Sequence, residues 1–260
     1  MDTPITQYLH FAKQMATDVV RRMQRTHTDH VIEKKAVGDW FSALDLELER
    51  DMRQRVQTTY PDHGFLGEED GASGQSEWMW VVDPIDGSMN FLRGFPHYSV
   101  SIALLHRGEP WVACVADPAR NEFFTAAKGL GAHLNELPIR ASQVDQLSEA
   151  VAATVFPKPA SPQMTGYMQR LDRVLRNVAG ARRTGSMALD LAYLAAGRVD
   201  AFWAQNMGPW DAAAGVLLVR EAGGEVFTLD QRSWLDSQDI AASTHGLMSG
   251  WRSLLIGRPQ

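Results

Sequence analysis

Residues 80–91 read Trp80-Val81-Val82-Asp83-Pro84-Ile85-Asp86-Gly87-Ser88-Met89-Asn90-Phe91. The apolar run predicts a buried strand that ends in two aspartates. Burying two carboxylates is costly unless a cation neutralises them, and hard oxygen ligands suit Mg²⁺ or Ca²⁺. Gly87 and Ser88 then begin a new segment, whose backbone N–H groups suit an anion such as phosphate. Carboxylates for a metal beside amides for phosphate indicate metal-assisted phosphate chemistry.

The whole chain has the length and composition of an ordinary globular protein. Its 260 residues are enough for one large domain or two medium ones. The net charge of −6 argues against direct nucleic-acid binding. The single cysteine, Cys114, excludes an internal disulfide and indicates a reducing compartment. No segment is apolar for long enough to span a bilayer and no signal peptide is visible, so we expect a cytoplasmic protein without membrane contact.

The pattern of elements changes near residue 145, so we predict an α+β half over residues 1–145 and an α/β half over residues 146–260. In the first half, a helix through residues 5–23 and a helix over Ala43–Thr59 flank a short loop at residues 38–40. Short strands with tight turns follow and predict an antiparallel sheet, over Trp78–Val82, Tyr98–Leu105, Val112–Asp117 and Glu122–Ala126. In the second half we expect strands over Val151–Val155 and Val199–Trp203, and helices over Gln163–Asn177, Met187–Ala196 and Asp211–Ala222.

Two further acidic motifs accompany the strand that ends at Asp83. Gly67-Glu68-Glu69-Asp70 reads equally well as a solvated acidic turn. Pro209-Trp210-Asp211-Ala212-Ala213-Ala214-Gly215 opens an apolar helix, where Asp211 also suits the N-cap position. Each motif has a structural explanation of its own, but the three in this order together favour a shared metal site.

In combination, these motifs resemble the inositol monophosphatase family of Mg²⁺-dependent, lithium-sensitive phosphomonoesterases. The family motifs G-E-E, D-P-[IL]-D-G-[TS]-x-N-F and W-D-x-A-A-G appear at residues 67–69, 83–91 and 210–215, and the resemblance covers nearly the whole chain. It implies the sugar-phosphatase fold, a layered α-β-α-β-α sandwich with the site between the two halves. The first half then supplies most metal ligands, and the second supplies Asp211 and the substrate contacts.

The resemblance also implies how the metals are held. Asp83 bridges two Mg²⁺ ions, Glu68 and the carbonyl of Ile85 complete the first site, and Asp86 and Asp211 hold the second. A third ion, where one is bound, involves Lys34 and Glu69. The presence of proline at position 84 has a physical explanation. Pro84 biases Asp83 toward an extended backbone, which helps Asp83 and the Ile85 carbonyl to converge on one ion.

Catalytic roles follow from the same resemblance. The nucleophile is a water activated by the metals, with Glu68 as proton acceptor and Ser88 as the residue that orients it. Ser88 stands where the family usually has threonine, so the hydroxyl is kept and the β-branch is lost. Asp45 matches an aspartate that hydrogen-bonds this hydroxyl, although helix capping explains Asp45 nearly as well. The amides of Gly87 and Ser88 bind the phosphate.

The residues expected to bind substrate are Asp86, Gly87, Ser88, Gly185, Met187, Gln205 and Asp211. Gln205 stands where inositol phosphatases carry a glutamate that accepts hydrogen bonds from inositol, and Met187 replaces a small residue unless it points into the core. Arg182-Arg183 could recognise a second anionic group, or could be surface residues. The leading prediction is hydrolysis of inositol 1-phosphate or a similar small polyol phosphate by a homodimer. The alternatives are a phosphatase for histidinol phosphate, fructose 1,6-bisphosphate or 3′-phosphoadenosine 5′-phosphate, or a non-catalytic regulatory protein on the same fold.

Overall fold

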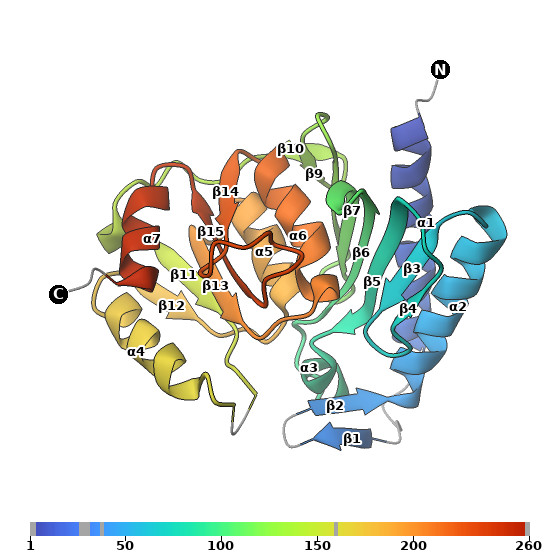
Figure 1. The fold of residues 1–260 in the computed structure, drawn as a ribbon, viewed down its shortest axis with the longest axis horizontal. Coiled ribbons are helices and arrows are strands. Elements are labelled where there is room, and N and C mark those ends of the chain that lie inside the picture. The colour runs from blue at the N-terminus through green and yellow to red at the C-terminus, as the bar shows by residue number, and fades with distance from the viewer. Residues whose placement is uncertain (1–3, 26–31, 37–38, 159–160, 258–260) are drawn as a thin grey trace.

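The computed structural model describes residues 4–25, 32–36, 39–158 and 161–257, and of residues 32–36 and 39–42 it describes the backbone alone. Five layers of helices and sheets stack across the molecule (Figure 1). This is the α-β-α-β-α sandwich that the motifs imply, so the predicted fold class is confirmed.

The first two layers come from the N-terminal part of the chain. Helices α1 (Pro4–Arg25) and α2 (Ala43–Thr59) cover one face of an eight-stranded sheet in the order β10-β9-β8-β7-β6-β5-β3-β4. Its strands are β3 (Gly64–Gly67), β4 (Ala72–Ser73), β5 (Trp78–Asp86), β6 (Ser99–His106), β7 (Glu109–Asp117), β8 (Glu122–Ala127), β9 (Ala132–Leu134) and β10 (Leu137–Ile139). All neighbours are antiparallel except β3 and β5, so the predicted antiparallel pairing of the four main strands is confirmed.

The other three layers come from the C-terminal part. Helices α5 (Met187–Ala195) and α6 (Pro209–Glu221) lie between the two sheets, and α4 (Met164–Leu175) and α7 (Met248–Ile256) cover the far face. The five-stranded sheet has the order β12-β11-β13-β15-β14. Its strands are β11 (Val151–Thr154), β12 (Gly180–Arg182), β13 (Ala201–Gln205), β14 (Gly224–Phe227) and β15 (Asp239–Thr244). A 3₁₀ turn, Leu147–Glu149, joins the two parts of the chain.

Strand β5 is buried on both faces, which explains its continuous apolar sequence. Trp80 and Val82 pack with α1 and α2, whereas Val81 belongs to the cluster that contains α5 and α6. A strand between two helical layers has no solvent-facing side, so its sequence does not alternate between apolar and polar residues. The central layer therefore buries both sheets against the same helices.

The predicted loop between α1 and α2 is wrong in part. Residues 39 and 40 belong to β2 (Asp39–Ser42), which pairs antiparallel with β1 (Ile32–Ala36) in a separate two-stranded sheet. Aromatic residues at 40 and 41 favour a strand, and this signal outweighs the polar character of the segment. The hairpin lies beside the short helix α3 (Ser88–Leu92), at the end of β5 where the acidic residues gather (Figure 1).

A β-bulge at the end of β5 decides where its aspartates point. Asp83 pairs with Ser101 of β6 and Asp86 pairs with Ser99, so three steps along β5 match two along β6. In a regular strand, residues three positions apart face opposite sides of the sheet. The extra residue turns both aspartates toward the same side, where α5 and α6 begin.

Candidate active site

Ten of the eleven predicted site residues line one cleft of about 860 Å³, between the end of β5 and the starts of α5 and α6. They are Glu68, Asp83, Ile85, Asp86, Gly87, Ser88, Gly185, Met187, Gln205 and Asp211. The remaining one, Asp45, is 2% exposed and lies behind the cleft wall. Residues from the loop after β3, from β5 and β13 and from the starts of α3, α5 and α6 thus meet across 143 positions of sequence, from Glu68 to Asp211.

Three carboxylates converge inside this cleft. One oxygen each from Asp83, Asp86 and Asp211 lies within 4.8 Å of the other two. Asp83 and Asp86 are buried, and Asp211 is half-buried in the first turn of α6. Asp211 Oδ2 also accepts a hydrogen bond from the N–H of Gly208 at 2.7 Å, so it caps the helix and joins the cluster at once. The predicted N-cap position is wrong, because Gly208 is the N-cap and Asp211 stands at the third position of the helix; its role as a metal ligand stays a prediction.

In the part of the chain that the structure describes, this acidic cluster has no basic side chain bonded to it. Within the described part of the chain, no lysine, arginine or histidine forms an ion pair with any of the three carboxylates. Burial, and then the charges of Glu68, Asp86 and Asp211, raise the pKa of Asp83 well above its usual range. Burial, followed by Asp86 and Glu68, does the same to the pKa of Asp211. Close, buried carboxylates of this kind fit a divalent cation with oxygen ligands.

Asp86 is fixed by donors from two other elements. Its Oδ2 accepts hydrogen bonds from Ser186 Oγ at 2.6 Å, the Ala188 N–H at 2.8 Å and Ser99 Oγ at 3.3 Å. Burial raises the pKa of Asp86, and these hydrogen bonds act against the rise. The start of α5 and strand β6 therefore hold one oxygen of this carboxylate in place.

Ser88 connects three of the predicted site residues. Its Oγ lies 2.9 Å from Asp45 Oδ1 and 2.8 Å from the carbonyl oxygen of Ile85. A hydroxyl has one hydrogen, so Ser88 donates to only one of these acceptors at a time. If a cation occupied the Ile85 carbonyl, Asp45 would remain as the acceptor that orients the hydroxyl. Asp45 thus contacts Ser88, as its match to the family predicts.

Glu49 holds the loop that carries Glu68, and sequence reasoning missed it. Glu49 is fully buried on α2, and its carboxylate accepts the backbone N–H groups of Glu69 at 2.7 Å and Asp70 at 2.9 Å. A Cβ on Gly67 would lie 2.2 Å from the Glu49 carboxyl carbon, which explains the glycine of the motif. The available signal was spacing, because Glu49 follows Asp45 by four positions and so lies on the same helix face.

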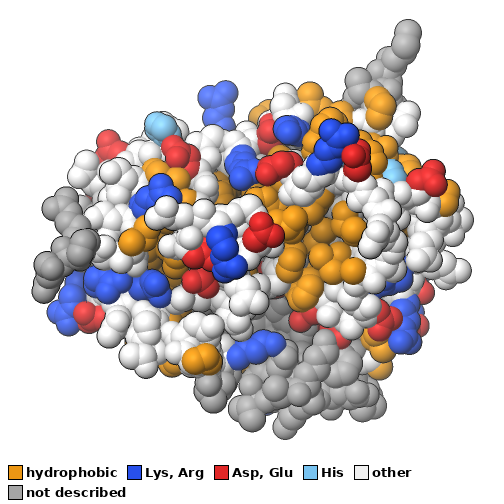
Figure 2. Space-filling view, viewed as in Figure 1, with side chains coloured by type: hydrophobic (Ala, Val, Ile, Leu, Met, Phe, Trp, Pro, Cys, Tyr) orange, Lys and Arg blue, Asp and Glu red, His pale blue; other side chains and the backbone are white. Residues whose placement is uncertain are grey.

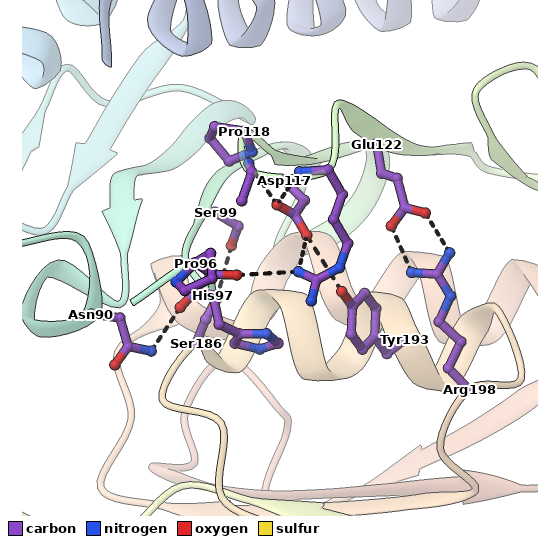
Figure 3. Close-up of polar contacts among 12 residues, drawn as sticks. Asn90, Pro96, His97, Ser99, Asp117, Pro118, Glu122, Ser186, Tyr193 and Arg198 are labelled. Atoms are coloured by element: carbon purple, nitrogen blue, oxygen red, sulfur yellow. Dashed lines mark hydrogen bonds and ion pairs between the residues drawn. The ribbon is translucent and has the colours of Figure 1, made fainter. Parts of the chain in front are cut away.

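A second set of contacts joins the segment after β5 to the start of α5. Asn90 Nδ2 donates to the carbonyl oxygens of His97 at 2.7 Å and Thr184 at 2.9 Å. Figure 3 shows Asn90 reaching the backbone at His97, and Ser99 directed at Ser186. Gly87 has φ +93°, and a Cβ there would lie 3.1 Å from the Gly185 carbonyl. Only glycine allows the two segments to approach this closely.

Helix α5 is also fastened to the eight-stranded sheet from behind. Asp117 at the end of β7 is fully buried and accepts hydrogen bonds from Tyr193 at 3.3 Å and Arg120 at 3.0 Å. Figure 3 shows Tyr193 of α5 directed at Asp117, and Arg198 paired with Glu122 nearby. These contacts fix the helix whose first turn holds Asp86.

Two residues that were predicted to bind substrate have protein partners of their own, and for Met187 this agrees with the core position that the sequence left open. Gln205 lines the cleft but is held at both ends, because Oε1 accepts from Arg170 at 3.1 Å and Nε2 lies 3.4 Å from Asp239 Oδ2. Met187 is 6% exposed, packs in the central core and also lines the cleft. Of the two residues predicted for a third ion, Glu69 is described and half-buried, whereas the side chain of Lys34 lies outside the described part of the structure.

Comparison with known proteins agrees with this geometry. The sequence model of the inositol monophosphatase family matches residues 3–255. The chain belongs to the inositol monophosphatase family. Among the relatives of this family member is Nus factor SuhB of Xylella fastidiosa, 44% identical over 83% of this chain and 78% of the relative. Another is the inositol-1-monophosphatase of Rhizobium meliloti, also 44% identical, over 73% and 72% of the two chains.

Solved structures of the family superpose along almost the whole chain. Extragenic suppressor protein suhB of Bartonella henselae has a TM-score of 0.88 and 35% identity, covering 94% of this chain and 96% of that one. Inositol monophosphatase of Anabaena has a TM-score of 0.85 and 31% identity, covering 99% and 98%. None of the helices in the described residues has the length and apolar character needed to cross a membrane.

Proposed function

We propose that this protein is a Mg²⁺-dependent phosphomonoesterase that hydrolyses inositol 1-phosphate or a similar small polyol phosphate. The observation that supports this is the cluster of Asp83, Asp86 and Asp211, whose oxygens lie within 4.8 Å of one another and form no ion pair with a described lysine, arginine or histidine. Family membership adds the reaction class, because one of the relatives is named an inositol-1-monophosphatase.

The residues that would hold Mg²⁺ follow from their chemistry. Asp83, Glu68 and the Ile85 carbonyl would hold one ion, and Asp83, Asp86 and Asp211 a second. When bound, the ions supply Lewis-acid chemistry, polarising the phosphate and offsetting negative charge at the reacting oxygens. A third ion at Glu69 and Lys34 belongs to the same proposal.

The chain's own residues would perform the remaining steps. The amides of Gly87 and Ser88, at the start of α3, would hold phosphate oxygens. Glu68 would accept a proton from water, while Ser88, fixed by Asp45, would orient that water. The water oxygen forms a bond to phosphorus, the ester P–O bond breaks, and the alcohol leaves after protonation.

The test is phosphate release from inositol 1-phosphate, histidinol phosphate, fructose 1,6-bisphosphate and 3′-phosphoadenosine 5′-phosphate. Each reaction is run with Mg²⁺, with EDTA, and with Mg²⁺ plus lithium. We expect Mg²⁺-dependent, lithium-inhibited release that is fastest from inositol 1-phosphate, and loss of at least ~10³-fold in Asp83→Asn. An Asp83→Asn variant with full activity would refute the metal assignment.

The relatives named Nus factor SuhB favour a second candidate, a binding role that does not need catalysis. The face in Figure 2 intersperses basic and acidic side chains, and the net charge is −6, so a protein partner suits this chain better than bare nucleic acid. Asp83→Asn separates the two candidates, because it removes turnover and leaves the outer surface unchanged. A cellular phenotype that the deletion strain shows and the Asp83→Asn strain does not would support the binding role.

A homodimer also belongs to the proposal, since it is implied by the family. Light scattering coupled to size-exclusion chromatography should give a mass near twice 28.9 kDa. A mass near 28.9 kDa at all concentrations would exclude the dimer.

A further inference from the structure

Two buried polar side chains behind the cleft lack a full set of hydrogen bonds. His97, which precedes β6, is 7% exposed, and Asp190, in the first turn of α5, is 1% exposed. Among the residues that the structure describes, neither His97 Nε2 nor Asp190 Oδ2 has a hydrogen-bond partner. A buried polar atom without a partner costs free energy, so both side chains lower the stability of the fold where they stand.

The two side chains lie next to each other. His97 Nε2 is 3.8 Å from Asp190 Oδ1, which is longer than a hydrogen bond. The His97 ring also packs edge-on against Tyr193 of α5, with ring centres 5.7 Å apart (Figure 3). Burial lowers the pKa of His97 and raises the pKa of Asp190 well above its usual range. An ion pair needs a charge on both groups, and burial disfavours both charges, so this contact is a neutral one.

The pair joins two segments that lie on either side of Gly87. A Cβ on Gly87 would lie 3.3 Å from the His97 carbonyl oxygen and 3.1 Å from the Gly185 carbonyl oxygen, so this glycine is enclosed between them. Asn90 bridges the same two segments, because its Nδ2 donates to the carbonyl oxygens of His97 and Thr184. The position of Gly87 therefore depends on how closely the two segments are held together.

Asp190 is also linked to the donors that hold Asp86. Its Oδ1 accepts a hydrogen bond from Thr184 Oγ1 at 2.7 Å, which fastens the chain just before α5 to the first turn of that helix. The same stretch supplies Ser186 Oγ and the Ala188 N–H to Asp86 Oδ2, at 2.6 and 2.8 Å. A shift of this stretch would move both donors away from Asp86.

We propose that His97 and Asp190 form a positioning pair: they fix the start of α5 against the segment after β5, and so hold Asp86 and Gly87 in their places in the cleft. Neither member of the pair lines the cleft, so both act through their neighbours and not by touching substrate. The consequence for Mg²⁺ binding rests on the proposed function. Replacing groups that orient metal ligands typically weakens metal binding by about 10- to 100-fold.

Titration calorimetry with Mg²⁺ measures that consequence. In the double variant His97→Phe/Asp190→Leu we expect the Mg²⁺ dissociation constant to rise about tenfold, because Thr184 loses its acceptor. The Mg²⁺ concentration for half-maximal phosphate release should rise by the same factor, while kcat at saturating Mg²⁺ stays within about twofold of wild type.

The melting temperature separates positioning from a merely structural role. The metal-free double variant should melt at or above the wild-type temperature, because two buried polar atoms without partners are replaced by apolar groups. A structural role alone would lower the melting temperature and the activity together, and that result would overturn the proposal.

A conservative variant and a matched control assign the effect to the pair. Asp190→Asn keeps an oxygen acceptor for Thr184, so its Mg²⁺ dissociation constant should stay within about twofold of wild type. The matched control is His106→Phe, since His106 lies outside the cleft and also has a carboxylate oxygen, from Glu77, at 3.7 Å. It should bind Mg²⁺ as wild type does. An unchanged constant in the double variant, or equal weakening in His106→Phe, would overturn the proposal.

A failure of the proposed function gives a different result. If the wild-type protein binds no Mg²⁺ and releases no phosphate, the proposed function is refuted, and hydrogen exchange of the metal-free proteins tests the pair by itself. The Ala188 N–H lies in the first turn of α5, where it has no acceptor within the helix and donates to Asp86. It should exchange about tenfold faster in the double variant than in wild type, and at the wild-type rate in His106→Phe. Equal exchange rates of this amide in all three proteins would overturn the proposal.

Discussion

At the scale of single residues, Asp83 illustrates a conflict between stability and function. Its carboxylate is 2% exposed and lies among other acidic groups, and burial raises its pKa well above the usual range. The carboxyl group of Asp83 therefore holds its proton more tightly in the folded protein than in the unfolded chain. Without metal, the free energy of unfolding must fall as pH rises above the unfolded value of about 3.9, until the folded pKa is passed.

We predict that Asp83→Asn raises the melting temperature of the metal-free protein while abolishing activity. The amide removes the buried charge, and its Oδ1 can still accept from the Ile85 N–H, as Asp83 does at 2.9 Å. Calorimetry in EDTA should show the gain at neutral pH and a smaller gain toward pH 4. The exposed-site control Asp236→Asn should show neither effect. A lower melting temperature for Asp83→Asn at neutral pH would contradict this prediction.

Ser88 gives a second prediction at this scale. Ser88→Ala should lower kcat about 10- to 100-fold, because it removes the hydroxyl that Asp45 and Ile85 hold. Ser88→Thr keeps the hydroxyl and should retain most of the activity. In a double-mutant cycle, Asp45→Asn should cost little once Ser88 is alanine, because the two side chains act through one hydrogen bond. If the losses in kcat from Ser88→Ala and Asp45→Asn were fully additive in the double variant, Asp45 would act only in stabilising helix α2.

At the scale of elements, helix α2 acts as a support for the acidic loop after β3. Glu49→Gln should lower kcat/KM about tenfold or more and raise the Mg²⁺ concentration needed for half-maximal activity. The amide cannot accept both backbone N–H groups that now fix the loop beside Glu68. The matched control is Glu47→Gln, on the exposed face of the same helix, where Glu47 pairs with Arg22. Equal effects of the two variants would count against a support role for Glu49.

The elements also show how far sequence reasoning reaches. Periodicity gave the bounds of α2 as found, Ala43–Thr59, because one apolar stripe and a following proline define both ends. The sequence pattern predicted that this strand, β5, ends at Val82, whereas it continues through Asp86. The continuation depends on pairing with β6 and on the bulge, and only Pro84, a residue tolerated at bulges, hinted at it. Side-chain contacts between residues far apart in the chain could not be predicted from local sequence. Arg170, for example, donates to Gln205 from another element, 35 positions away.

For the candidate site, residue types and order were enough to predict which side chains gather. Ten of those eleven residues line the cleft because their motifs end strands or begin helices at the same edge. What local sequence could not give is the state of each side chain after folding. Gln205 is engaged by Arg170 and Glu49 is buried, and both of these facts depend on packing across the layers. The division near residue 145 stays a prediction.

At the scale of the whole molecule, the only cysteine reports on the integrity of the layers. Cys114 of β7 is fully buried in the cluster under α1, and burial raises its pKa to about 12. We predict that the native protein resists thiol reagents at pH 8, and that labelling in urea follows global unfolding. Fully denatured protein, with its single thiol, is the control. Rapid labelling of the native protein would mean that this layer opens locally.

The separation of the metal ligands along the chain has a consequence for biosynthesis. Glu68, Asp83 and Asp86 leave the ribosome well before Asp211, which opens α6 near the last fifth of the polypeptide. During that interval the nascent protein carries a strand with strongly acidic residues at its end and no opposing layer to complete their surroundings. If these residues bind divalent cations as proposed, the full site would form only after translation is nearly finished, and metal loading would then act as a check that synthesis is complete. A prematurely terminated product would lack this stabilisation and would be left to cellular proteolysis.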